Sequence, residues 1–424
     1  MLKFLLKGML RDKSHSLFPI ITVSLGVCVS VIMVCWIEGV FGDMIGNTSK
    51  LQTGHVKVIS PEYAKEMDTY PLEYSMLDTN NMTQYLSENY PDYSWVQRID
   101  FGGIIDVPDE NNETKEQGFF FGKAVDLCSG DSSEIDHLNL IEALQTGIIP
   151  QKPDEILLSS GLMSKLKLSL GDSVTLISNT MDGSMSMKNF SISGTVLFGV
   201  EAIDKQAVIV DLQGARELLY MEDAAAEILG ISHDNFYSQE ETERMKAEYN
   251  LQNSSNLLLS SSIMITLRDQ AGFGAYLDMV DSYIGTFLFI FILIMSIVLW
   301  NSGLMKGIRR FGEFGIRLAI GETKGHIYRS LIAESTLIGI VGTIIGTCFG
   351  LLFGYYLQEI GVSFGDMVKN SSIMISNTIY AKITPKAYYI GFIPGLFASV
   401  TGAMLSGRAI YKRKTSQLFK ELEQ

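Results

Sequence analysis

Residues 309–329 of this 424-residue chain read RRFGEFGIRLAIGETKGHIYR, and an apolar run from Ser330 to Leu357 follows them. The apolar run exceeds the roughly 20 residues that a helix rising about 1.5 Å per residue needs to cross a bilayer. The basic stretch before it indicates the cytoplasmic side, because lysine and arginine accumulate in the short cytoplasmic loops of membrane proteins. The other segments of the chain can be placed relative to this loop.

Three further apolar runs, at 17–37, 283–305 and 387–407, are also long enough to cross a bilayer. Three segments lie on the same side of the membrane as this loop: 1–16, 306–329 and 408–424. Together they hold 15 of the 33 lysine and arginine residues. We therefore predict that both termini are cytoplasmic. The remaining segments outside the spans carry 41 acidic against 18 basic residues, a balance that argues against nucleic-acid binding.

The predicted fold is an α-helical integral membrane protein with four transmembrane helices and a large mixed α/β exoplasmic domain between helices 1 and 2. The expected segments are a cytoplasmic amphipathic N-terminal helix (1–16), the first span (17–37), the exoplasmic domain (38–282) with a helical stalk (268–282), the second span (283–305), a cytoplasmic coupling loop (306–329), the third span (330–357), a short exoplasmic loop (358–386), the fourth span (387–407) and a cytoplasmic tail (408–424).

Alternating and continuous apolar patterns predict the elements of the exoplasmic domain. Strands are expected at 51–58, 94–107, 118–125, 173–177, 190–196, 207–211 and 257–266, and helices at 80–89, 162–168, 212–219 and 238–251. The segment 268–282 has a helical pattern that leads into the second span without a breaker. A helix that is continuous from the domain through the membrane would form a stiff stalk.

The residues that could carry catalysis or hold a cofactor do not form a known constellation. No nucleophile or acid is spaced to act with His55, which we interpret as a structural residue at a strand edge rather than a catalytic one. The stretch 118–124 (GFFFGKA) has too few residues between its glycines for a phosphate loop, and Ala124 replaces the Mg²⁺-binding hydroxyl. We expect no cofactor or metal on this chain, and no catalytic residues.

The third span carries two features that need an explanation. Gly339, Gly342, Gly346 and Gly350 recur every three or four residues and predict a smooth face for close helix packing. Glu334 lies about one turn inside the span, where an ionisable side chain is a candidate for function. Its shallow depth equally allows it to reach the interface or to pair with Arg329.

The loop and the third span together resemble the MacB/FtsX-type ABC transporter permease family, within it the LolC/LolE-like, lipoprotein-releasing type. The resemblance rests on the pattern Glu313-x-Gly315-Ile316-Arg317-x-Ala319-Ile320-Gly321, on 331–335, on Asn301 and on the four glycines of the third span. It implies that the loop forms a coupling helix that docks into a groove on an ATPase. The residues assigned to this role are Arg310, Glu313, Phe314, Gly315, Arg317, Ala319 and Gly321.

The resemblance also implies the function and the partners. We expect a non-catalytic permease subunit of the bacterial inner membrane that works with two copies of an ABC ATPase, which bind the ATP and Mg²⁺, and with a second permease chain, identical or paralogous. The expected substrates are lipoproteins or amphipathic molecules of the outer leaflet, with membrane lipid and a periplasmic lipoprotein or carrier as further partners and no nucleic acid. Alternatives are an FtsX-like adaptor that activates a periplasmic partner, MacB-like efflux of a periplasmic substrate, and a membrane-anchored enzyme.

Overall fold

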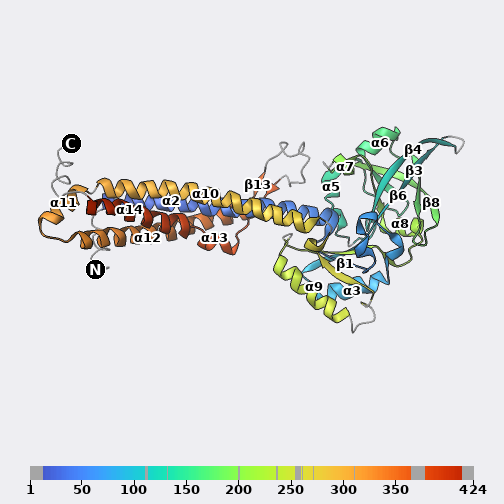
Figure 1. Ribbon diagram of the computed structural model, residues 1–424. Helices are drawn as coiled ribbons and strands as arrows, with labels where there is room; N and C mark the ends of the chain where they lie inside the picture. Colours follow the sequence, from blue (N-terminus) through green and yellow to red (C-terminus); the bar gives the residue numbers. More distant parts are fainter. Residues whose placement is uncertain are drawn as a thin grey trace. The chain divides into compact units, whose positions relative to one another are not determined.

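A computed structural model of the protein describes residues 13–109, 113–130, 132–198, 201–234, 237–253, 259, 261–270, 272–309, 311–363 and 378–412. The chain divides into two units. The outer unit comprises 42–278 and 364–377, and the helical unit comprises 1–41, 279–363 and 378–424. Figure 1 gives the element labels used below. Most of the predicted N-terminal helix, the C-terminal tail and the middle of the loop 358–386 lie outside the described residues.

The outer unit is built on one ten-stranded mixed sheet, in the order β12-β1-β11-β3-β4-β9-β6-β8-β5, with β7 paired to β3 and β8. Its strands are β1 (Val56–Ile59), β3 (Tyr93–Pro108), β4 (Thr114–Val125), β5 (Leu144–Gly147), β6 (Glu155–Ser159), β7 (Ser173–Asn179), β8 (Met185–Val196), β9 (Ala207–Asp211), β11 (Glu227–Ser232) and β12 (Ile263–Thr266).

Six of these strands close into a barrel, because β7 bonds to both β3 and β8 and thereby joins the two ends of the path β3-β4-β9-β6-β8. Closure leaves no free edge among these strands, which removes a site for unwanted strand pairing. Side chains such as Phe101, Phe120 and Phe190 fill the interior. Helices α6 (Ser160–Leu166) and α8 (Leu212–Leu219) add leucines to the same core.

The sixteen-residue strand β3 joins this barrel to a second, smaller core. Its first residues pair with β11 and its later residues pair with β4. Helices α3 (Thr79–Asn89) and α9 (Gln239–Asn253) pack on this extension and bury Met82, Leu86 and Tyr249 against Trp95. In Figure 1 both helices lie beside β1, away from the barrel strands. Strand β3 therefore contributes side chains to two of the hydrophobic cores of the outer unit.

The helical unit contains the long helices α2 (Lys13–Thr48), α10 (Phe273–Arg309) and α12 (Lys324–Ile360), although α2 and α10 each extend into the outer unit. A fourth segment consists of α13 (Pro385–Tyr389), the π-helix η7 (Ile393–Ala398) and α14 (Ser399–Lys412). These four helical segments are long and apolar enough to cross a membrane. Together with the outer sheet they confirm the predicted fold class.

Four predicted elements differ from the structure. The strand expected at 257–266 begins only at Ile263. Residues Ser49–Thr53 continue α2 as a π-helix (η1) where a strand was expected, and Gly54, at φ +65°, ends it with a bond from its amide to Ser49 O of 2.7 Å. The expected helix at 268–282 begins only at Phe273, because a capped 3₁₀ turn precedes it. The fourth span is interrupted at Pro394, since proline cannot donate the helical hydrogen bond.

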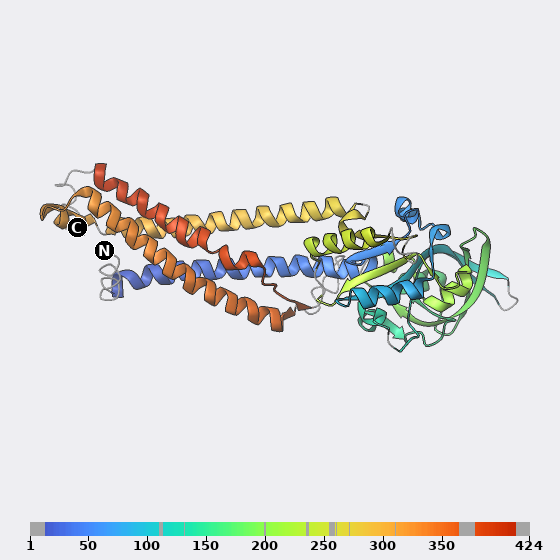
Figure 2. The same cartoon turned by 90° about the horizontal axis from the view of Figure 1, so that it is seen from below.

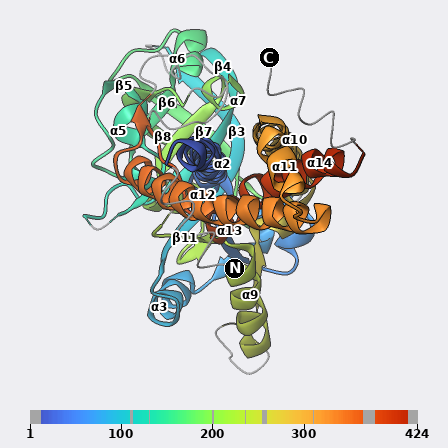
Figure 3. The ribbon, with the colours of Figure 1, turned by 90° about the vertical axis from the view of Figure 1, so that its left-hand side faces the viewer.

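The predicted glycine face of α12 packs on two neighbouring segments. A Cβ added to Gly342 would lie 2.7 Å from Val23 Cγ1, and one added to Gly346 would lie 2.5 Å from Ser24 O. Gly350 faces Val31 in the same way, whereas Gly339 faces Ser399 of α14 at 2.9 Å. Figure 2 shows α12 crossing α2, and Figure 3 shows α12 passing α2 in a view almost along the axis of α2. The helices approach this closely because no side chain separates them.

A buried ion pair holds α4 (Glu134–His137) against β3 of the outer unit. The Arg98 guanidinium, fully buried, donates from Nε to Glu134 Oε1 at 2.7 Å and from Nη2 to Glu134 Oε2 at 2.6 Å. His137 Nδ1 lies 3.9 Å from Glu134 Oε2 and 3.5 Å from Ser133 Oγ. Burial lowers the pKa of His137 from 6.5 to about 4; the Glu134 carboxylate opposes this shift and the Arg98 charge adds to it.

We predict that replacing Gly346 with alanine destabilises the helical unit by about 1–3 kcal/mol, because the added methyl overpacks the contact with α2. Gly285→Ala is the matched control: on α10 a Cβ would meet nothing within 4 Å, and the change should stabilise the helix by up to about 1 kcal/mol. Unfolding of the full chain by sodium dodecyl sulfate in mixed micelles measures both. Equal stability of the two variants would contradict the close packing.

We also predict that the outer unit loses stability between pH 7 and pH 5. The unfolded chain takes up a proton at His137 as the pH falls through 6.5, whereas the folded chain does so only near 4. This group alone should lower the free energy of unfolding by about 2 kcal/mol over that interval.

Urea titrations of the full chain at both pH values, followed by pulse proteolysis, provide the measurement. His137→Asn should reduce the pH dependence by that amount. His233→Asn, at an exposed position, is the control and should leave it unchanged. Identical pH dependence in the wild type and in His137→Asn would show that His137 is not held neutral by the fold.

Candidate functional site

The predicted coupling loop is a short helix followed by a tight turn. Helix α11 (Phe311–Ala319) follows α10, and the chain turns at Gly321, whose φ of +100° places it in the left-handed region that favours glycine. The amide of Glu322 donates to Arg317 O at 3.0 Å, and Thr323 caps α12 by accepting from the His326 amide. The turn is therefore defined on both sides by its own hydrogen bonds.

The inner face of α11 is fixed by apolar contacts. Phe314 is only 2% exposed and packs with Ile327 and Leu331 of α12 and with Ala403 of α14, and Leu318 lies against this cluster. A phenyl ring buried in this way contributes about 1.5–3 kcal/mol relative to an exposed one. The loop is therefore anchored to the helical unit by Phe314.

An ionic cluster braces the turn. Arg317 donates from Nε and Nη2 to the two carboxylate oxygens of Glu322 at 2.6 and 2.7 Å, and His326 Nδ1 contacts the same carboxylate. The hydrogen bonds from Arg317, and then from His326, lower the pKa of Glu322 despite some desolvation. Glu322 and His326 were missed from the sequence, because Arg317 and Glu322 are five residues apart across a turn, which is not a helical spacing.

The remaining residues assigned to coupling divide into an inner and an outer group. Gly315 is buried with Phe314, whereas Glu313, Ala319 and Gly321 are exposed and Arg317 is half-buried. Ile316 and Ile320 are also exposed, the latter by 82%. Arg310 lies outside the described residues. The outer face of α11 thus combines one carboxylate with apolar side chains that the helical unit does not cover.

Other candidates from the sequence have plainer roles in the structure. Glu334 is half-buried on α12, and its function stays a prediction. His55 is buried and accepts a bond from the Ser232 amide at Nδ1, 3.1 Å away, which agrees with its interpretation as a structural residue. The glycine-containing stretch 118–124 lies within strand β4 and so does not form a phosphate loop. Among the described residues no cluster of histidine, cysteine and carboxylate side chains could hold a metal ion.

Further glycines, which the sequence pattern did not single out, also lie in close helix contacts. Gly391 and Gly395 face Val27 of α2 and Thr347 or Thr343 of α12, and Gly354 faces Cys35. The glycine contacts of the helical unit therefore extend beyond the face predicted on α12.

Comparison with known proteins places this architecture in a family. Residues 285–415, which include α11, α12 and α14, match the family described as FtsX-like permease C-terminal. The lipoprotein-releasing system transmembrane proteins LolC of Xylella fastidiosa strains Temecula1 and 9a5c are each 26% identical to this chain over 231 residues, which is 52% of this chain. The chain spans about half the length of these curated relatives, since 53% of each is covered.

A solved structure, the periplasmic region of MacB from Actinobacillus actinomycetemcomitans, aligns with a TM-score of 0.35 and 13% identity, covering 55% of this chain and 96% of that one. The family match and the LolC relatives agree with the resemblance found in the loop and the third span. Residues 285–415 therefore match the FtsX-like permease domain, and the chain is similar to LolC-type ABC transporter permeases.

Proposed function

We propose that this chain is the membrane subunit of an ABC transporter and that helix α11 is the point at which the ATPase acts on it. The observation that carries the proposal is the family match over 285–415, which contains α11 and the helices on either side of it. The exposed Glu313, Ile316 and Ile320 supply a mixed polar and apolar docking face. Such a face suits a groove on a protein partner.

The anchoring of α11 supports a mechanical role. A partner that moves a docked helix can displace the permease only if the helix does not shift independently of its neighbours. Phe314 and the Arg317–Glu322 pair oppose such a shift. Helices α10 and α12 flank α11, and each has 37 residues, or roughly 55 Å at 1.5 Å per residue. A displacement at α11 would be carried along these two uninterrupted helices.

The subunit composition follows from the same proposal. The chain itself is non-catalytic; ATP and Mg²⁺ bind to two copies of a separate ATPase. Four helices enclose little space, so a second permease chain, identical or paralogous, completes the membrane part. The excess of lysine and arginine in 1–16, 306–329 and 408–424 favours an orientation in the bacterial inner membrane with α11 and both termini in the cytoplasm and the outer unit in the periplasm.

The proposed substrate is a lipoprotein or another amphipathic molecule that is extracted from the outer leaflet of this membrane. Support comes from the LolC relatives, whose names describe a lipoprotein-releasing system. An outer α/β unit of this size, built around a closed barrel, provides surface for a bound protein or carrier.

We predict that Glu313→Lys and Ile320→Glu each reduce the amount of ATPase retained on the purified chain by at least about tenfold. The first variant reverses a charge in the docking face, and the second places a charge where the partner would contact an apolar side chain. Affinity purification of the tagged full chain from its native membranes in a mild detergent, with co-purifying proteins identified by mass spectrometry, is the measurement. Glu359→Lys, an exposed charge reversal at the opposite end of α12, is the matched control and should retain the ATPase.

The outcomes separate the alternatives. A lipoprotein in the wild-type fraction supports extraction, a peptidoglycan hydrolase supports a signalling adaptor, and a soluble periplasmic cargo supports efflux. An ATPase that remains bound to both α11 variants would contradict docking on this helix, and the lack of any ATPase in several detergents would overturn the transporter function.

A further inference from the structure

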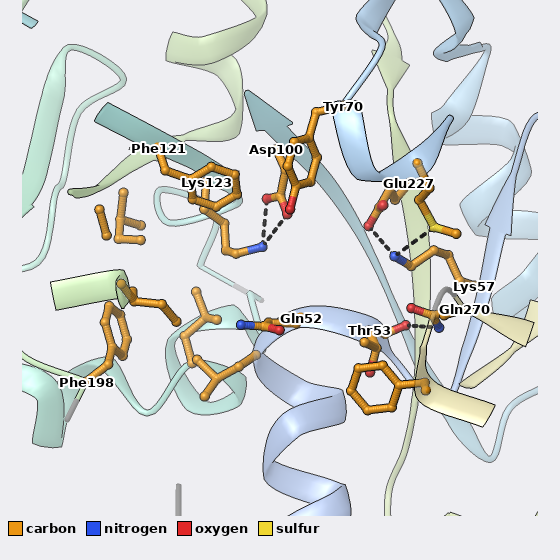
Figure 4. Close-up of a pocket in the computed structure, with 17 residues that line it drawn as sticks. Gln52, Thr53, Lys57, Tyr70, Asp100, Phe121, Lys123, Phe198, Glu227 and Gln270 are labelled. Carbon is orange, nitrogen blue, oxygen red and sulfur yellow. Dashed lines mark hydrogen bonds and ion pairs between the residues drawn. The ribbon is translucent and has the colours of Figure 1, made fainter. Parts of the chain in front are cut away.

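The outer unit contains a cavity of about 200 Å³ on the outward face of its barrel. Figure 4 shows the lining residues: Asp100 of β3 and Phe121 and Lys123 of β4 lie on one side, and Gln52 and Thr53 of η1 lie on another. Residues before and within the start of α10 complete the wall. The cavity therefore lies where the end of α2 and the beginning of α10 meet the sheet.

Most of the wall is apolar. The rings of Tyr70, Phe121, Phe198 and Phe273 line it together with aliphatic side chains of the neighbouring elements. Tyr70 and Phe121 are in contact, with ring centroids 5.2 Å apart. An enclosed apolar cavity of on the order of 150 Å³ is large enough to hold a benzene-sized molecule. This cavity has room for a ligand of that size or slightly larger.

The charged side chains in the wall neutralise one another. Lys57 Nζ lies 2.8 Å from Glu227 Oε2, and Lys123 Nζ lies 2.6 Å from Asp100 Oδ1. All four side chains are almost completely buried. Figure 4 shows the two pairs in the same wall. A charged ligand would have to compete with one of these pairs or remain unpaired in a site of low polarity, which is unfavourable.

One polar group in the wall has no partner. Thr53 Oγ1 is buried and makes no hydrogen bond within the described part of the chain, although the main-chain oxygen of Thr53 accepts from Gln270 Nε2 at 3.0 Å. A buried hydroxyl without a partner costs about 1–3 kcal/mol. Gln52, next to it, also lines the cavity. The end of α2 thus offers hydrogen-bonding groups to a molecule in the cavity.

We propose that this cavity binds a small neutral amphiphile, with an apolar body of roughly six to ten carbon atoms packed against the aromatic rings and one hydroxyl or amide group bonded to Thr53. Size, lack of net charge and the unpartnered hydroxyl each select this class. A bound molecule would contact Thr53 and Phe273 together, and would therefore stabilise the attachment of both long helices to the sheet. The inference goes beyond the proposed function, since it requires no ATPase and no transport.

The test uses the full chain in lipid nanodiscs and a hexanol that carries an aliphatic diazirine. After photolysis, adducts are mapped by peptide mass spectrometry, and labelling of the membrane helices serves as the background. We expect saturable adducts on peptides that contain Tyr70, Phe121 or Phe273. Excess hexanol should remove them, whereas hexanoate and hexylammonium should compete at least about tenfold more weakly.

Two variants test the site itself. Gln52→Trp places an indole at the cavity from an exposed position and should reduce the saturable labelling by at least about tenfold. Gln151→Trp, at an exposed position that does not line the cavity, should leave it unchanged. Thr53→Val keeps the volume but removes the hydroxyl, and should weaken competition by hexanol about fivefold.

Several results would overturn the proposal. Labelling that does not saturate, or that is equal in Gln52→Trp and wild type, would mean that the cavity holds only water or partitioned solvent. Competition by hexanoate as strong as that by hexanol would overturn the neutral class, and wild-type affinity in Thr53→Val would overturn the assignment of the polar end. Resistance to proteolysis is checked in each variant. If Gln52→Trp fails to fold, Thr53→Val and the competition series still decide.

Discussion

Within the outer unit, the side chain of Arg98 holds the π-helical end of the first long helix against the sheet. Its guanidinium makes two sets of hydrogen bonds. Nε and Nη2 donate to the Glu134 carboxylate, and Nη1 donates to Leu51 O at 3.0 Å. Leu51 lies in the π-helical end of α2. One planar group with donors in fixed directions thus joins β3, α4 and the end of α2. Burying a charged pair is costly, so its value lies in specifying this one arrangement more than in added stability.

Further hydrogen bonds hold the residues that follow the end of α2 against β11 and against the segment before α10. His55 donates from its amide to Gly230 O at 2.9 Å, and its carbonyl accepts from the Leu267 amide at 3.2 Å. Gln270 reaches the carbonyl of Thr53, one residue before Gly54. Three segments that are far apart in the chain are therefore fixed at one place within the outer unit. The cavity lies at the same place, and this explains why its wall includes residues from both ends of the unit.

The parts of the fold that were predictable from the sequence are those with local signals. Long apolar runs predicted the four helices that are long enough to cross a membrane. The periodicity at 80–89 and 94–107 predicted α3, which begins one residue earlier, and β3, which extends one residue further at each end. The closure of the barrel through β3 and β7 was not predictable, since about 70 residues separate the paired positions and no turn links them. The Arg98–Glu134 pair is non-local in the same way.

The candidate site shows the same division between local pattern and tertiary context. The motif at 313–321 indicated a short helix in the loop, and α11 is that helix; its coupling role stays a prediction. The motif could not indicate that Phe314 would face inward while Ile320 faces outward, because that depends on where α14 places Ala403. Likewise, Glu322 became part of the site only through the left-handed turn at Gly321, which brings it back to Arg317.

These contacts make α12 the central helix of the helical unit. It packs on α11 through Ile327 and Phe314, on α14 through Gly339 and Ser399, and on α2 through Gly346 and its neighbours. Contacts between glycine and backbone leave little free space, so a helix held in this way moves with its neighbours rather than past them. A displacement of α11 therefore has a continuous packed route into α2.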